Sequence, residues 1–177
     1  MKCFALNDWS CITPEVLETL CQWRGQTLKE VWLNWDEKEH KNGHQLHWSS
    51  CCIVIGRKYW AFASGSCTFC FIQSDLTQPQ LSAELEPETS TWQLNPLPGL
   101  KQRTDQTIED VRLVEYRDDF WETRWHGIEL ITETGSIVFC LDDGDFNGLE
   151  FETPDPNEFD VHCVHALQSK SKTVIIK

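Results

Sequence analysis

The sequence has few basic residues for its length. It carries 15 Lys and Arg against 28 Asp and Glu, which gives a formal net charge of −13 at pH 7. Proteins bind nucleic acid and anionic membrane surfaces through clusters of Lys and Arg. The basic cluster visible here is a short tail with Lys170, Lys172 and Lys177. We therefore expect neither nucleic acid nor a membrane as a partner.

Long apolar runs are also missing. No stretch approaches the ~20 apolar residues of a membrane span. The opening MKCFALNDWS has only a short apolar patch, which Asn7 and Asp8 interrupt, and this is unlike a secretory signal. These features predict a cytoplasmic protein. The nine cysteines are an odd number, and in a reducing compartment they predict buried thiols rather than a disulfide framework.

Motifs for catalysis or for metal binding are absent as well. We find no Gly-x-Ser-x-Gly, no phosphate-binding glycine loop and no His-Glu-x-x-His. The Cys-x-x-Cys from Cys67 to Cys70 has no second pair to complete a zinc set. The histidines whose spacing leaves a zinc site open as an alternative are His40, His44, His47, His162 and His165. We expect no enzyme, no cofactor and no metal.

What the chain does have is an acidic second half. Residues 104–160 contain 17 acids and three bases, a net charge of −14, whereas the rest of the chain has 11 acids and 12 bases. Such a field repels polyanions and steers a basic partner toward the protein. The alternative is that the acids serve solubility alone.

The first clear element is a helix at about 14–24. Thr13 suits the N-cap, Pro14 the first turn and Gly25 the C-terminal stop. After it the pattern becomes β, with predicted strands at 27–35, 46–56, 57–64 and 67–73. The Pro-rich stretch 74–105 reads as a linker, with a short helix possible at 81–85.

The β pattern then starts again. Residues 26–31 (QTLKEV) reappear as residues 106–111 (QTIEDV), and later features follow in the same order. We infer an α+β protein, mainly antiparallel β-sheet, built from an internal tandem repeat of four-stranded units with an N-terminal helix. The units could pack face to face or pair edges into one sheet.

The predicted organisation is a single compact domain, 1–177. Its parts are an N-terminal segment and helix (1–25), repeat 1 (26–73), the linker (74–105), repeat 2 (106–153) and a C-terminal tail (154–177). In the tail we expect a short helix at 158–168 and then an edge strand, TVIIK.

The stretch DDGDFNGLEFE, residues 142–152, resembles the first half of a calcium loop. Counted from Asp143, however, the twelfth position is Pro154 and not the Glu that closes an EF-hand site, and the flanks read as strands. Glu150 or Glu152 would have to substitute in a non-standard site. A hairpin turn is the simpler interpretation, because Asp and Gly suit turns.

Two segments combine aromatic and acidic side chains, as protein-binding surfaces do: EYRDDFWETRWHG (115–127) and the stretch that begins NWDEKE (34–39). The alternative is a polar hairpin with a few core aromatics. The residues we predict to bind a partner are Asp118, Asp119, Trp121, Glu122, Asp142, Asp143, Asp145, Trp35 and Glu37.

In size, acidity, these aromatic and acidic segments and the absence of catalytic motifs, the chain resembles the immunity proteins of bacterial toxin–antidote systems, such as those of contact-dependent inhibition or type VI secretion. The resemblance implies an acidic cytoplasmic protein that neutralises a cognate basic toxin, such as a nuclease, by occluding its active site. Its acids would mimic substrate phosphates. The alternatives are a ligand-binding or enzymatic module, or a structural subunit.

Overall fold

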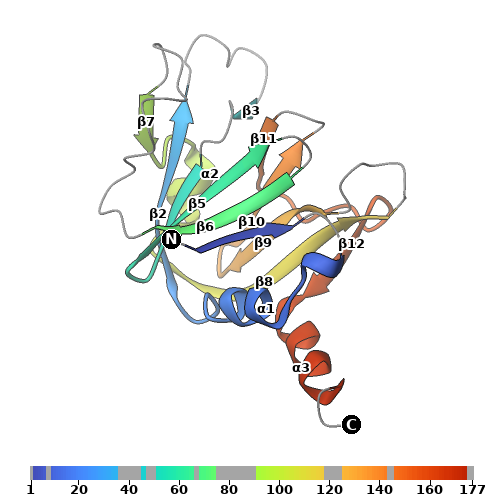
Figure 1. Ribbon diagram of the computed structural model, residues 1–177. Coiled ribbons are helices and arrows are strands. Elements are labelled where there is room, and N and C mark those ends of the chain that lie inside the picture. Colours follow the sequence, from blue (N-terminus) through green and yellow to red (C-terminus); the bar gives the residue numbers. More distant parts are fainter. Residues whose placement is uncertain are drawn as a thin grey trace.

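The protein is mainly one antiparallel β-sheet with a few short helices. The computed structural model describes residues 2–6, 9–35, 45–46, 51–65, 68–74, 91–117, 125–142 and 146–174 (Figure 1). The strands are β1 (Lys2–Leu6), β2 (Thr27–Trp35), β3 (Gln45–Leu46), β4 (Cys51–Ile55), β5 (Lys58–Gly65), β6 (Thr68–Ser74), β7 (Thr91–Leu94), β8 (Gln106–Tyr116), β9 (Trp125–Thr132), β10 (Gly135–Asp142), β11 (Phe146–Glu150) and β12 (Phe159–Cys163). The helices are the 3-10 turn η1 (Trp9–Cys11), α1 (Pro14–Cys21), α2 (Pro98–Arg103) and α3 (Val164–Val174).

The helix α1 forms where the sequence predicts it. The Thr13 side chain accepts a hydrogen bond from the Val16 N–H (3.3 Å), and Pro14 occupies the first turn. Its apolar face carries Val16, Leu17 and Leu20, all buried. The helix ends at Cys21, three residues earlier than expected.

The strands pair antiparallel throughout the described residues. Their order is β1-β6-β5-β4-β2-β8-β9-β10-β11-β3, with β7 also on β2 and β12 also on β8. An antiparallel sheet with an N-terminal helix is therefore confirmed. The strand β1 was not expected from the sequence, and it pairs with β6 at the sheet edge.

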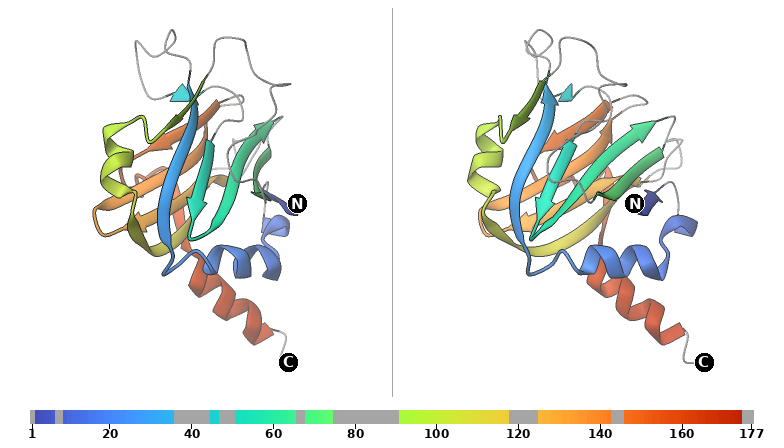
Figure 2. Two further views of the ribbon diagram at one scale, coloured as in Figure 1. Left: turned by 90° about the vertical axis from the view of Figure 1, so that its left-hand side faces the viewer. Right: turned by 60° about the vertical axis from the view of Figure 1, so that its left-hand side comes forward.

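The two halves of the sheet meet at β2 and β8. These strands pair only at their first residues, Thr27 with Thr107 and Leu28 with Gln106. Beyond that point β7 runs beside β2 and β12 beside β8, so the halves diverge. They bend over each other as two facing layers (Figure 2). One apolar core between them takes residues from both, such as Leu28 and Val31 of β2 and Val111 of β8.

The connections of the two halves correspond to each other. Strands β2-β4-β5-β6 and β8-β9-β10-β11 each form a four-stranded run, and β7 and β12 return to the first strand of each run. Each first strand has a register shift at the same place, after Leu28 and after Ile108. The Gly25 N–H donates to the Ile108 carbonyl (2.8 Å), and the Asp105 N–H donates to the Leu28 carbonyl (2.7 Å).

The C-terminal tail differs from its prediction. The stretch 158–168 was expected to be helical with a strand after it, but β12 comes first and α3 follows. The reason is tertiary, because residues 159–163 pair along β8 from Tyr116 to Arg112 and satisfy their backbone groups there. The predicted strand 173–177 is wrong for Thr173 and Val174, which belong to α3.

The stretch 74–105 contains β7 and α2 in its described part, and the helix predicted at 81–85 lies outside the described residues.

Among the described helices, none has the length and apolar character needed to cross a membrane.

Candidate functional site

One end of the second half of the sheet gathers several strand ends. Strand β8 ends there at Tyr116, and its neighbour β9 begins there at Trp125. Strand β10 ends at Asp142, paired with Phe146 at the start of β11, and β12 begins opposite Tyr116. We call this the acidic end, because segments 117–124 and 143–145 join these strands, segment 151–158 reaches the same end where β12 begins, and all three carry several Asp or Glu residues.

The described part of the acidic end is exposed and held by polar contacts. The guanidinium of Arg117 donates to the Asp160 carboxylate (2.8 Å), and its backbone N–H donates to the Glu158 carbonyl (3.0 Å). The Asp155 carboxylate accepts from the backbone and side-chain N–H groups of Asn157. The exposed acids of the described residues at this end are Asp155 and Glu158.

The structure places two of the nine predicted partner-binding residues on strands. Trp35 is the last residue of β2 and pairs with Thr91, and Asp142 is the last residue of β10. The others lie outside the described residues: Glu37, Asp118, Asp119, Trp121, Glu122, Asp143 and Asp145. Strands β10 and β11 pair antiparallel on the two sides of the predicted hairpin turn, and the turn residues 143–145 lie outside the described residues.

A buried carboxylate lies on the core side of β8, near the acidic end. Glu115 is 3 % exposed, and it accepts a hydrogen bond from the Trp9 indole N–H (3.0 Å). Its other oxygen lies 2.5 Å from Nε2 of His162. Trp9, Trp125 and His162 stack edge to face around it, with ring centroids 4.9–5.7 Å apart. Trp9 is 40 % exposed, so this cluster presents an aromatic ring at the surface.

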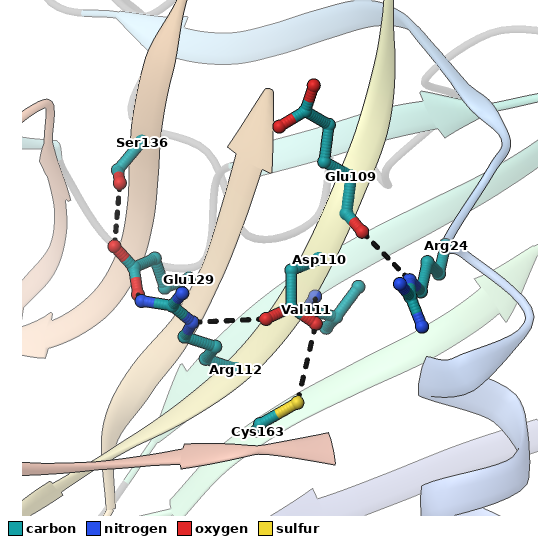
Figure 3. Close-up of polar contacts among 8 residues, drawn as sticks. All are labelled: Arg24, Glu109, Asp110, Val111, Arg112, Glu129, Ser136 and Cys163. Atoms are coloured by element: carbon teal, nitrogen blue, oxygen red, sulfur yellow. Dashed lines mark hydrogen bonds and ion pairs between the residues drawn. The ribbon is translucent and has the colours of Figure 1, made fainter. Parts of the chain in front are cut away.

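The opposite face of β8 carries a charged network (Figure 3). Arg112 donates through Nε to Asp110 (3.2 Å), and its Nη1 lies 3.6 Å from a carboxylate oxygen of Glu129. Glu129 is completely buried and also accepts from the Ser136 hydroxyl (2.7 Å). Asp110 further accepts from the Val111 N–H (3.0 Å).

The ends of this network differ in character. On one side the Cys163 thiol of β12 lies 3.5 Å from Asp110. On the other side Arg24 donates to the Glu109 carbonyl (2.9 Å), while the Glu109 side chain points away from the network (Figure 3). Because Glu129 is the buried member, the network holds β8, β9 and β10 together rather than presenting a charge to a ligand.

A third cluster lies farther along the same face, on strands β9 to β11. His126, Cys140 and Glu150 place their ligand atoms within 4.8 Å of one another. The His126 ring, and more weakly the Cys140 thiol, hold the pKa of the Glu150 carboxyl below its usual range, against the opposing effect of burial. Among the described residues, these are the three that could hold a metal ion together.

An open depression of about 700 Å³ lies in the first half, between α1 and the β4–β5 turn. It is lined by Gln22, Trp23, Gln26, Ile55, Gly56, Arg57, Lys58 and Trp60. The titratable side chains among these described residues are Arg57 and Lys58. An acid–base pair, which an enzymatic site of the hydrolytic kind needs, is not among them.

Sequence reasoning missed most of the polar residues described above. Register shifts occur in β8 after Ile108 and between β8 and β9 at Glu115, and they change which side chains share a face. The signal that could have found Glu129 is its carboxylate in the mainly apolar strand β9, WHGIELIT, whereas Arg112 is one of several charged residues in β8 and has no such signal. Comparison of the chain with protein-family models, with curated proteins and with solved structures gave no match.

Proposed function

We propose that this chain is an acidic binding protein that neutralises a cognate basic protein, a toxin such as a nuclease, by covering its active site. The observation that carries the proposal is the topology of the second half. Antiparallel pairing brings the ends of β8 and β10 and the starts of β9, β11 and β12 to one end of the sheet. The two segments that join strands at that end, 117–124 and 143–145, carry Asp118, Asp119, Glu122, Asp143 and Asp145.

The mechanism follows from electrostatics. Acids concentrated at one end of a molecule attract a basic cleft over about 10 Å at moderate salt and speed association. Aromatic contacts then slow dissociation. Trp9 at the surface beside Glu115 supplies such a contact near the acidic end, and the predicted Trp121 would supply a second. The protein needs no catalytic group for this role, so we propose that it is not an enzyme.

We also propose that the two halves derive from duplication of one unit. Support comes from the matching order of strands, the matching register shifts and the reciprocal hydrogen bonds of Gly25 and Asp105 across the junction. In this account the halves have diverged in charge, and the second half carries the binding surface.

The experiment is capture of the partner from an extract of the source cell, at low and at high salt. We expect one basic protein held at 1:1 and released by salt. The variant Asp118→Asn/Asp119→Asn/Glu122→Gln should lose it. The purified chain should also abolish the activity of the captured protein.

A matched control is available at the opposite end of the same strands. Asp105→Asn/Glu109→Gln/Glu133→Gln removes the same three charges from exposed positions at the start of β8 and at the β9–β10 turn. It should retain the partner. Equal retention by both triple variants would refute the acidic end as the binding surface, and a partner bound without loss of activity would refute neutralisation.

A further inference from the structure

We infer that His126, Cys140 and Glu150 form a binding site for one divalent transition-metal ion of the zinc type. The site lies on the outer face of the second half, away from the main core, and the inference does not depend on the proposed function. It rests on the donor set, on its spacing and on the surroundings that hold it.

The spacing suits a single ion. The three ligand atoms lie within 4.8 Å of one another, and His126 Nε2 is 3.7 Å from the nearest Glu150 oxygen. Ligands bound to one zinc ion at about 2.0–2.3 Å stand about 3.3–3.8 Å apart in a tetrahedron. The His–Glu pair already fits, and Cys140 requires a closure of about 1 Å, within reach of a side-chain rotation.

The strands bring the three residues together across the sheet. Cys140 of β10 is opposite Gly127 of β9 and opposite Gly148 of β11, and Glu150 is two residues from Gly148 on the same face. His126 is the extra residue of the bulge in β9, because Val114 pairs with Gly127 and Glu115 with Trp125. The bulge turns its ring to the outer face, where it meets Phe159 and Tyr116.

His126 is oriented as a ligand. Its Nδ1 lies 3.0 Å from the Tyr116 hydroxyl, and Phe159 packs on its ring at 4.5 Å between centroids. When Nδ1–H donates to the phenol oxygen, Nε2 carries the lone pair toward Cys140 and Glu150. Nε2 is buried, since His126 as a whole is 5 % exposed. It has no hydrogen-bond partner among the described residues. The polar atom that Nε2 faces, a Glu150 oxygen at 3.7 Å, is beyond hydrogen-bond distance, and an ion placed between the two would bind both.

The donor set selects the class of metal. One imidazole nitrogen, one thiolate sulfur and one carboxylate oxygen match zinc and its close relative cobalt, whereas magnesium and calcium prefer oxygen alone. The apolar side chains of Val114, Val138 and Phe159 surround Cys140 and favour a bound, neutralised thiolate over a free one. Glu150 is exposed, which leaves a fourth position open to water or to another ligand.

The test is a titration of the full chain, kept reduced, with Co²⁺, followed by competition with Zn²⁺. We expect one ion per chain with a thiolate-to-cobalt absorption band that Zn²⁺ removes. Cys140→Ser should abolish the band, Glu150→Gln should weaken binding at least about 10-fold, and Tyr116→Phe should weaken it about 10-fold through the His126 ring. The matched control is Cys163→Ser, whose thiol lies on the same face beside Asp110 and should leave the titration unchanged.

Circular dichroism of each variant reports whether it folds. If Cys140→Ser does not fold, the titration of Glu150→Gln, whose side chain is half exposed, tests the metal site instead. A band that persists unchanged in Cys140→Ser or in Glu150→Gln would overturn the site. So would a wild-type chain that takes up neither Co²⁺ nor Zn²⁺ at equimolar amounts in equilibrium dialysis.

Discussion

Single residues set the boundaries between the strands and helices of this protein. Gly25 and Asp105 precede the two first strands, β2 and β8, and both have positive φ angles, +77° and +60°. A backbone in this region costs an L-residue roughly 1 kcal/mol relative to glycine. Each also donates its N–H across the junction, so the conformation is required by the pairing of the two halves.

Gly25→Ala tests this requirement without a steric complication, because a Cβ built at Gly25 meets no atom within 4 Å. We expect the free energy of unfolding to fall by about 1 kcal/mol from backbone strain alone. Asp105→Gly is the reciprocal control and should be neutral or slightly stabilising, since its ion pair with Lys29 is exposed. Urea denaturation measures both, and an unchanged midpoint in Gly25→Ala would contradict the account.

The buried thiols of Cys51 and Cys52 in β4 should make the protein less stable as the pH rises in the alkaline range. Burial, and for Cys52 also the charge of Glu30, raises the pKa of both, that of Cys52 from 9.0 to about 12. Below about pH 9 both states hold the proton. Above it the unfolded chain releases protons that the folded chain keeps, so stability is lost as the pH rises toward 12.

Above pH 9 we expect the free energy of unfolding to fall by up to about 1.4 kcal/mol per pH unit for each thiol. Urea midpoints measured under reducing conditions at about pH 8 and about pH 10 should therefore fall more in the wild-type chain than in Cys51→Ala/Cys52→Ala. The cavities left by the double substitution lower its urea midpoint at both pH values. They therefore do not affect the change in midpoint between the two pH values. Parallel decreases in the two proteins would contradict the buried, neutral state of these thiols.

At the scale of elements, β8 is the strand that joins the second half of the sheet to the first. It pairs with β2, β9 and β12, and its outer face carries Asp110 and Arg112 opposite the buried Glu129. Removing one partner of a buried charge costs more than the pair contributes, because the remaining charge stays desolvated.

We therefore expect Arg112→Met to lower the free energy of unfolding by about 3 kcal/mol. Arg117→Met is the matched control, five residues farther along the chain and directly after the end of β8, and its pair with Asp160 is half exposed on both sides. That variant should change stability by less than about 1 kcal/mol. Thermal or urea unfolding distinguishes them, and similar losses in the two variants would show that the Arg112–Glu129 contact is not a buried interaction of this kind.

The elements were largely predictable because local signals agree with the fold. Thr13 and Pro14 locate α1, and alternation over residues 27–35 gives β2 with its bounds as observed. The signals fail where pairing overrides local preference. Residues 159–163 look helical in isolation, yet β8 offers them an unpaired edge. The bulge that turns His126 outward depends on β8 as well, and one strand alone does not reveal it.

At the scale of the whole molecule, the two halves share a core and differ in charge. One continuous antiparallel sheet bends so that both halves bury their inner faces together, and α1 covers the junction with α3 beside it (Figure 1). The sequence predicted the charge asymmetry directly, because charge is additive along a chain. It could not predict which strand ends meet at one end of the sheet, since that depends on the strand order.

The measurement that tests the central claim most directly is the association rate constant with the captured partner as a function of ionic strength. The wild-type chain and the opposite-end variant, Asp105→Asn/Glu109→Gln/Glu133→Gln, should associate rapidly at low salt and slow steeply as salt is added. The acidic-end variant, Asp118→Asn/Asp119→Asn/Glu122→Gln, should associate at least about 10-fold more slowly at low salt and depend on salt only weakly. Equal rates and equal salt dependence in the two triple variants would contradict the account.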